Sequence, residues 1–283
     1  MFKRSKQSAP IGVFDSGLGG ISVLHEIHRL LPHEDLIYIA DSGHAPYGSK
    51  STTYITQRCL QLSQFLLEQG AKMLVVACNT ATAHAIDTLR QQLTVPVIGI
   101  EPAVKPAARL TRTGVIGVLA TQQTVQSQRL QRLIQEYASG IKVVTQACPG
   151  LVEHVERGDF SSPTLNSLLE RYTQPVVEQG VDVLVLGCTH YPFLVASLRA
   201  QIGCDITILE TSNAVALHVQ RLLDKYALNS RTEQSGLVYF YSSKDEAVHW
   251  QSMQLLWQQN IDHAMLPEPY LTIPAQMPVQ DQQ

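Results

Sequence analysis

An internal repeat is the feature that most constrains how this 283-residue chain can fold. Residues 68–80 match residues 178–190 at an offset of 110, with 6 identities in 13 positions. Two further matches keep the same order at offsets of 105 and 109: Ile11-Gly12-Val13 with Ile116-Gly117-Val118, and Glu101 with Glu210. Three pairings in order, with nearly constant offsets, predict that the chain contains two related halves.

Each half alternates short apolar runs with helical segments. Strands are expected at 11–14, 36–40, 72–77 and 95–100, and again at 115–120, 142–145, 181–187 and 206–209. Alternating strands and helices favour parallel sheets, and continuously apolar strands indicate sheets covered on both faces. We therefore predict an α/β fold of two pseudo-symmetric domains. Each is a mostly parallel sheet flanked by helices, and the active site lies in the cleft between them.

Composition and charge argue against nucleic-acid-binding, membrane-spanning and disulfide-rich secreted proteins. The net charge of −3 gives no basic surface for nucleic acid or for an acidic membrane. No signal peptide follows the N-terminal basic residues, and no apolar run reaches the 18 or so residues of a membrane span. Five cysteines are too few and too scattered for a disulfide scaffold, so we expect a cytoplasmic protein with reduced thiols.

Two of the five cysteines occupy the same position of the repeat. Cys78 and Cys188 each follow a buried strand and precede a helix. In open α/β sheets, ligands bind outside the carboxyl ends of the strands, so both thiols are placed where a ligand binds. A helix N-terminus also favours the thiolate. The other three cysteines, Cys59, Cys148 and Cys204, have no repeat partner and are expected to be packing residues.

A matched pair of thiols suits proton transfer better than nucleophilic attack, which needs one cysteine and a histidine base. One thiolate could remove a proton from one face of a carbon while the other thiol returns a proton to the opposite face. Redox pairing is the alternative, but neither cysteine lies in a C-x-x-C motif.

Polar residues surround both strand ends. The turn from Asp15 to Gly20 has neither the dinucleotide nor the nucleotide phosphate pattern, but its backbone N–H groups suit a carboxylate, and Asp15 and Ser16 add polar side chains. The matching turn of the second half, Thr121 to Thr124, offers hydroxyls without glycines. His190 is placed to tune Cys188, and no set of four metal ligands is present, so no metal is expected.

These motifs together resemble the glutamate racemases of the aspartate/glutamate racemase family. The resemblance rests on residues 12–20, 40–42 with 46–48, 77–81 and 187–192. It implies interconversion of L- and D-glutamate by two cysteines, without pyridoxal phosphate or another cofactor, supplying D-glutamate for peptidoglycan. It also implies a homodimer with glutamate as its small-molecule partner.

The resemblance also assigns site residues. It makes Cys78 the base for D-glutamate and Cys188 the base for L-glutamate, assisted by Asp15 and His190. The expected substrate contacts are Asp15, Ser16, Tyr47, Gly48, Asn79, Thr80, Thr121, Thr189 and His190. Glu156 stands where the family has a glutamate near the second thiol, although the preceding residues, Gly150 to Glu153, depart from the family's proline-containing run.

By resemblance, a strand at 237–241 and a helix near 244–257 return to the first half. The expected domains are therefore 1–100 with 211–265, and 101–210, followed by a flexible tail at 266–283. Two other functions stay open: a racemase of the same group acting on aspartate or another small amino acid, and a non-catalytic amino-acid-binding regulator.

Overall fold

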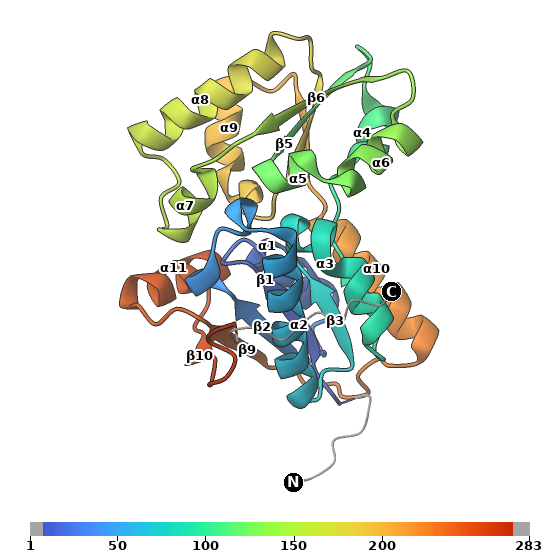
Figure 1. Cartoon of the computed structure of the whole chain (residues 1–283), viewed down its shortest axis with the longest axis vertical. Helices are drawn as coiled ribbons and strands as arrows, with labels where there is room; N and C mark the ends of the chain where they lie inside the picture. Colours follow the sequence, from blue (N-terminus) through green and yellow to red (C-terminus); the bar gives the residue numbers. More distant parts are fainter. Residues whose placement is uncertain (1–7, 274–283) are drawn as a thin grey trace.

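The computed structural model describes residues 8–273 and contains two parallel sheets, each at the centre of one lobe (Figure 1). The first sheet has the strand order β10-β9-β2-β1-β3-β4, and the second has the order β6-β5-β7-β8. Every strand pair in both sheets is parallel. The predicted α/β fold class is therefore confirmed.

The strands of the first sheet are β1 (Ile11–Asp15), β2 (Leu36–Ala40), β3 (Met73–Val76), β4 (Val97–Gly99), β9 (Val238–Ser242) and β10 (Asp262–Met265). Those of the second are β5 (Val115–Ala120), β6 (Lys142–Ala147), β7 (Val183–Gly187) and β8 (Thr207–Leu209). The shared order β2-β1-β3-β4 and β6-β5-β7-β8 gives the two halves the same topology, as the repeat predicts.

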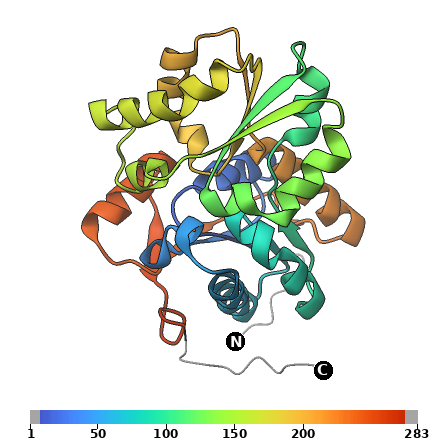
Figure 2. The same cartoon turned by 45° about the horizontal axis from the view of Figure 1, so that its top comes forward.

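Helices cover both faces of each sheet (Figure 2). The first lobe has α1 (Ile21–Leu30), α2 (Thr52–Glu68), α3 (Asn79–Gln92), α10 (Ser212–Tyr226) and α11 (Ala247–Trp257). The second has α4 (Val104–Leu110), α5 (Gln122–Gln126), α6 (Gln128–Tyr137), α7 (Leu151–Glu156), α8 (Pro163–Val177) and α9 (Val195–Ile202). Single turns of 3₁₀ helix are η1 (Ser42–His44), η2 (Tyr47–Ser49) and η3 (Tyr191–Leu194).

Alternation along the strands explains why both faces are covered. In β3, Met73 and Val75 join the core on the α1 and α10 side, while Leu74 and Val76 join the core beneath α2 and α3. All four side chains are fully buried. A strand with no polar side chain on either face is stable only between two layers of helices, which is the arrangement observed.

The chain passes from the first sheet to the second after β4 and returns after β8. Beyond that return, β9 pairs with β2 and extends the first sheet. The strand β10 has no apolar alternation and is absent from the sequence-based expectation; it forms because β9 presents an edge with which it pairs in parallel. The exact domain boundaries stay a prediction.

Part of the predicted flexible tail is wrong. Leu266 is 1% exposed, and Tyr270 and Leu271 pack against the core beneath α2. These apolar side chains pack the segment against the first lobe. Its prolines disfavour helix and sheet, but they do not prevent side chains from packing. Residues 274–283 of that prediction lie outside the described residues. Among the described helices, none has the length and apolar character needed to cross a membrane.

Candidate active site

The two repeat-matched cysteines line one small cavity between the lobes. Cys78 follows β3 and caps the N-terminus of α3, and Cys188 follows β7. They are 4% and 6% exposed. The cavity is lined by Ser16, Pro46, Tyr47, Gly48, Cys78, Asn79, Thr80, Thr121, Val152, Cys188, Thr189 and His190. The carboxyl ends of both sheets therefore face a common space.

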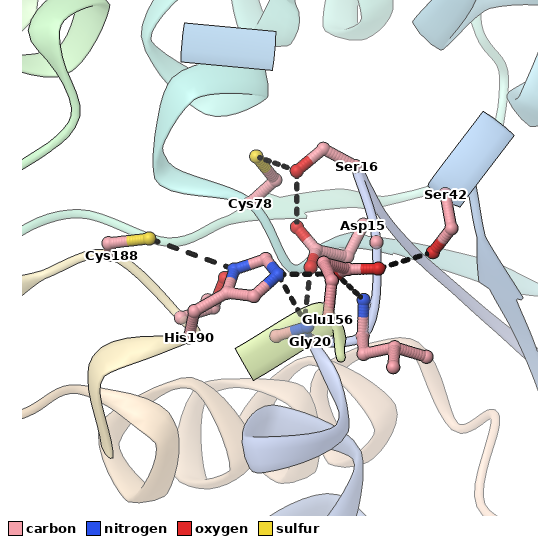
Figure 3. A network of polar contacts seen from close by, with 12 residues as sticks. Asp15, Ser16, Gly20, Ser42, Cys78, Glu156, Cys188 and His190 are labelled. Carbon is pink, nitrogen blue, oxygen red and sulfur yellow. Dashed lines mark hydrogen bonds and ion pairs between the residues drawn. The ribbon is translucent and has the colours of Figure 1, made fainter. Parts of the chain in front are cut away.

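On the first-lobe side, Cys78 belongs to a short chain of hydrogen bonds (Figure 3). Its thiol donates to Ser16 Oγ at 3.5 Å, and Ser16 in turn donates to Asp15 Oδ1 at 3.4 Å. Burial raises the pKa of the Cys78 thiol well above its ordinary value, and the nearby Asp15 carboxylate raises it further. The backbone N–H of Ala81 points at the sulfur from 3.4 Å and opposes that rise. This sulfur is therefore held as a thiol.

Asp15 is fully buried at the end of β1. Its Oδ2 accepts a hydrogen bond from the backbone N–H of Gly20 at 2.8 Å. Burial raises the pKa of Asp15, while the nearby His190 and the Gly20 hydrogen bond lower it in part. Asp15 is not among the residues that line the cavity; it lies behind Ser16 and acts on Cys78 from there.

On the second-lobe side, Cys188 faces a histidine. Its Sγ lies 3.8 Å from His190 Nδ1, and His190 Nε2 lies 2.6 Å from Glu156 Oε1. A carboxylate can only accept, so Nε2 carries the proton in this contact. The backbone nitrogen of Gly19 lies 3.2 Å from the same Nε2, but that nitrogen cannot accept while it donates to the carboxylate.

The charge of this trio follows from its surroundings. Burial lowers the pKa of His190, but Cys188 and Glu156 outweigh it and raise the pKa well above its ordinary value. For Glu156, burial raises the pKa, and the hydrogen bond and charge of His190 outweigh it, so that the pKa is lowered. His190 is thus an imidazolium placed between the Glu156 carboxylate and the sulfur of Cys188.

Glu156 also joins the two lobes. Its Oε1 accepts from the backbone N–H of Leu18 at 2.6 Å, and its Oε2 accepts from the Ser42 hydroxyl at 2.8 Å. Both donors belong to the first lobe, whereas Glu156 ends α7 of the second. Glu156, which the resemblance places near the second thiol, is therefore the residue that bridges the cleft.

The glycine-rich turn allows this close approach. A Cβ at Gly17 would lie 2.0 Å from Glu156 Oε1, and a Cβ at Gly19 would lie 2.2 Å from His190 Nδ1. Neither glycine has a positive φ, so space and not backbone conformation requires them. Gly17 and Gly19 carry no side chain because Glu156 and His190 of the second lobe occupy the space that a Cβ would need.

Three hydroxyls meet across the cleft at the other end of the cavity. Thr80 of the first lobe lies 2.8 Å from Thr121 and 3.2 Å from Thr124, measured between Oγ1 atoms, and Thr121 lies 3.0 Å from Thr124. Beside them, the buried Oδ1 of Asn79 has no hydrogen-bond partner among the described residues. A buried acceptor without a donor fits a ligand that brings one.

Tyr47 and Gly48 also line the cavity, and Gly48 lies against Thr121. A Cβ at Gly48 would lie 3.0 Å from Thr121 Cβ. The Tyr47 hydroxyl donates to Asp41 Oδ2 at 2.6 Å, and Asp41 pairs with Arg58, both side chains being fully buried. Tyr47 therefore turns its hydroxyl away from the cavity and toward this ion pair.

The predicted site residues are brought together by the structure. All of the expected substrate contacts except Asp15 line the cavity, and Asp15 and Glu156 lie directly behind it. Sequence reasoning missed Ser42, Thr124 and Val152 as neighbours of the site. For Thr124, a signal existed in the turn from Thr121 to Thr124, and Ser42 lies in segment 40–42, one of those that carry the family resemblance; for Val152, none was visible without knowing how the lobes meet.

The remaining cysteines divide differently from expectation. Cys59 and Cys148 are buried, as expected of packing residues. Cys204 is exposed in the turn between α9 and β8, so the expectation that it packs is wrong. Larger hollows exist on the surface, such as one beside Lys72 and Tyr226, but no cysteine lines them. Within residues 8–273, no cluster of three or more histidine, cysteine or acidic side chains is arranged to hold a metal ion.

Comparison with known proteins gives a consistent result. Residues 11–220 match the family model described as Asp/Glu/Hydantoin racemase. A glutamate racemase of Methylococcus capsulatus is 52% identical over 248 residues, covering 88% of this chain and 92% of that protein.

Two solved structures share the fold. A glutamate racemase of Francisella tularensis in complex with D-glutamate has a TM-score of 0.82 at 28% identity, covering 92% of this chain and 98% of that one. An Escherichia coli glutamate racemase in complex with L-glutamate and the activator UDP-MurNAc-ala has a TM-score of 0.81 at 30% identity, covering 90% and 97%. The chain, with its paired cysteines at the ends of matching strands, belongs to the aspartate/glutamate racemase family, among the glutamate racemases.

Proposed function

We propose that this protein interconverts L-glutamate and D-glutamate by moving a proton between Cys78, the α-carbon and Cys188. The observation that carries the proposal is that both thiols line a single cavity, one from each lobe. Two related proteins support the substrate, since one was solved with D-glutamate and the other with L-glutamate. The proposed reaction uses no cofactor.

The polar surroundings of the thiols support a direction for each of them. Cys188, beside the His190 imidazolium, would act as a thiolate that removes the α-proton of L-glutamate. Cys78, held as a thiol beside Ser16, would give a proton to the opposite face of the carbanion. The C–H bond on one face breaks and a C–H bond on the other face forms, leaving Cys188 protonated and Cys78 as a thiolate. D-glutamate reacts by the reverse steps, with Cys78 as the base.

The remaining residues of the cavity suit an amino acid with two carboxylates. The unpartnered Oδ1 of Asn79 would accept from the α-ammonium group. Hydroxyls of Thr80, Thr121 and Thr189 are donors for carboxylate oxygens, as is Ser16. Tyr47 and Gly48 would contact the substrate from the first lobe. The cavity is small and enclosed, so we infer that the lobes separate to admit the substrate and then close to exclude water.

The resemblance to bacterial relatives extends the proposal beyond the reaction. D-glutamate made in this way would supply peptidoglycan synthesis in the cytoplasm, and the protein would act as a homodimer. Light scattering coupled to size-exclusion chromatography tests the dimer: a mass near twice 31.3 kDa supports it, and a single-chain mass contradicts it.

The activity is tested by following the optical rotation of L-glutamate and of D-glutamate with the purified protein and no added cofactor. Both should decay to the racemate. In D₂O, the product enantiomer should carry deuterium at the α-carbon, because its proton comes from a solvent-exchanged thiol. Parallel assays with the enantiomers of aspartate separate the two racemase activities. Glutamate that binds without loss of rotation would support a regulator instead.

A further inference from the structure

The last described segment of the chain packs against the loop that carries part of the cavity wall. Residues 266–273, here the C-terminal strap, follow β10 and lie on the first lobe beside α2 (red in Figure 1 and Figure 2). The backbone N–H of Leu266 donates to Ser242 O at 2.8 Å. The ring of Tyr270 packs edge-on against Phe65 of α2, with centroids 5.2 Å apart. The strap is thus fixed to α2 by apolar contact.

A continuous series of hydrogen bonds leads from the strap to Tyr47. Gln61 Nε2 donates to Thr272 O at 3.1 Å, and Gln61 Oε1 accepts from Arg58 Nη1 at 3.2 Å. Arg58 donates to both oxygens of Asp41, from Nε at 2.8 Å and from Nη2 at 2.6 Å. Asp41 Oδ2 then accepts from the Tyr47 hydroxyl at 2.6 Å.

A second contact fastens the strap to the same loop. His44 Nε2 lies 2.7 Å from Leu271 O, and because a carbonyl only accepts, Nε2 carries the proton. His44 Nδ1 accepts from the Tyr54 hydroxyl of α2 at 2.5 Å. His44 and Tyr47 lie three residues apart in the loop, so the strap contacts the loop on one side of Tyr47 and reaches Tyr47 itself through α2.

The ion pair of Arg58 and Asp41, in the middle of this series of hydrogen bonds, has little room to move. Arg58 and Asp41 are both fully buried, and the fork of the guanidinium matches the two carboxylate oxygens. A buried pair tolerates neither partner's loss, because an unpaired charge remains. A shift of Arg58 is therefore passed on to Asp41 and to Tyr47 instead of being absorbed.

We propose that the C-terminal strap positions Tyr47 and Gly48 and thereby sets the affinity of the cavity for its substrate. Gln61, Arg58 and His44 are the positioning residues through which it acts. The inference rests on the proposed function, because it takes Tyr47 and Gly48 as substrate contacts. Neither thiol, nor Ser16, Asp15, His190 or Glu156, touches the strap in any described hydrogen bond, so the proton-transfer steps are left intact.

The test compares variants of α2 in the full-length protein. Gln61→Glu keeps an acceptor for Arg58 but removes the donor to Thr272. Gln57→Glu, on the same helix, is the matched control, since it introduces the same carboxylate at a side chain that makes no hydrogen bond within the described residues. For Gln61→Glu, we expect the KM for L-glutamate to rise about fivefold with kcat nearly unchanged, as loss of one hydrogen bond in the series predicts. The control should keep both values.

A second variant changes the strap itself and tests the same series of hydrogen bonds from its other end. Tyr270→Ala removes the packing on Phe65 and should raise KM to a similar extent. Combined with Gln61→Glu, it should add little, because both changes release the same segment. A wild-type KM in Gln61→Glu, or multiplicative effects in the double variant, would overturn the role of the strap. Failure of the unmodified protein to racemise glutamate would instead reject the proposed function, so the two failures are distinct.

Discussion

The two strand-end cysteines hold matching positions in the two sheets but lie beside different polar groups. Cys78 donates to the neutral hydroxyl of Ser16, with the Asp15 carboxylate behind it. Cys188 faces the ring of His190, which is held by Glu156. In the first half a negative group lies behind the thiol, and in the second a positive group lies in front of it.

Duplication accounts for the matching positions of the two sulfurs, and divergence of the two halves accounts for the different polar groups beside them. Duplication places two equivalent sulfurs at the carboxyl ends of β3 and β7, on opposite walls of one cavity. Equivalent surroundings would leave both sulfurs in the same protonation state, and two-base transfer needs one acid and one base at a time. The Ser16–Asp15 and His190–Glu156 pairs break that equivalence before any substrate binds.

The largest effect is expected when one of the two sulfurs is removed at a time. Cys78→Ser and Cys188→Ser should each lower the rate of racemisation by about 1,000-fold or more, because a serine hydroxyl is a far weaker acid and base in this pH range. Polarimetry from each enantiomer measures the loss. Cys204→Ser, which changes an exposed cysteine outside the cavity, is the matched control and should keep the full rate.

A different outcome would assign the chemistry to one lobe alone. If one of the two serine variants kept the wild-type rate in both directions, the second sulfur would be dispensable and the two-base mechanism would be wrong.

A smaller effect is expected when the second half loses its distinctive charge. In Glu156→Gln, His190 loses the carboxylate that holds its pKa high, and burial then lowers that pKa. The rate should fall by about 100-fold, as expected for loss of an assisting acid–base partner. Because the imidazolium is lost at a lower pH, the high-pH limb of kcat/KM should move toward lower pH, which a pH–rate profile from L-glutamate measures.

The contribution of His190 to the free energy of unfolding should also decrease as pH rises. The folded-state pKa of His190 lies above its unfolded value of about 6.5, so its stabilisation is complete below that pH and is lost as pH rises through the folded pKa.

Glu153→Gln, on the same helix as Glu156, removes a carboxylate that makes no hydrogen bond to His190 and serves as the control for Glu156→Gln. An unchanged pH profile in Glu156→Gln would show that Glu156 holds the lobes together without tuning His190.

The local parts of this site were predictable from sequence, and its assembly was not. The repeat around Cys78 and Cys188 predicts strands, strand ends and parallel order, because apolar runs and turn residues are local signals. The hydrogen bonds from Leu18 and Ser42 to Glu156 depend on how the second lobe meets the first, which no periodicity encodes. The strap was misjudged for a related reason: prolines suppress regular structure, but burial of Leu266 needs only an apolar side chain and a surface to receive it.

The mildest test adds a single methyl group where the halves touch. The second-half counterpart of the glycine-rich turn carries hydroxyls, so the glycines of the first half are needed only if Glu156 must come close. Gly17→Ala places a Cβ 2.0 Å from the present position of Glu156 Oε1 and should push the carboxylate away from Leu18 and His190. We expect kcat/KM to fall about tenfold, less than in Glu156→Gln because the charge remains, with unfolding free energy reduced by about 1–3 kcal/mol. Adding Glu156→Asp, which shortens the side chain, should recover part of both losses in rate assays and thermal unfolding. Wild-type behaviour of Gly17→Ala would mean that the turn is glycine-rich for another reason and that the close approach of Glu156 to the turn does not matter for the reaction.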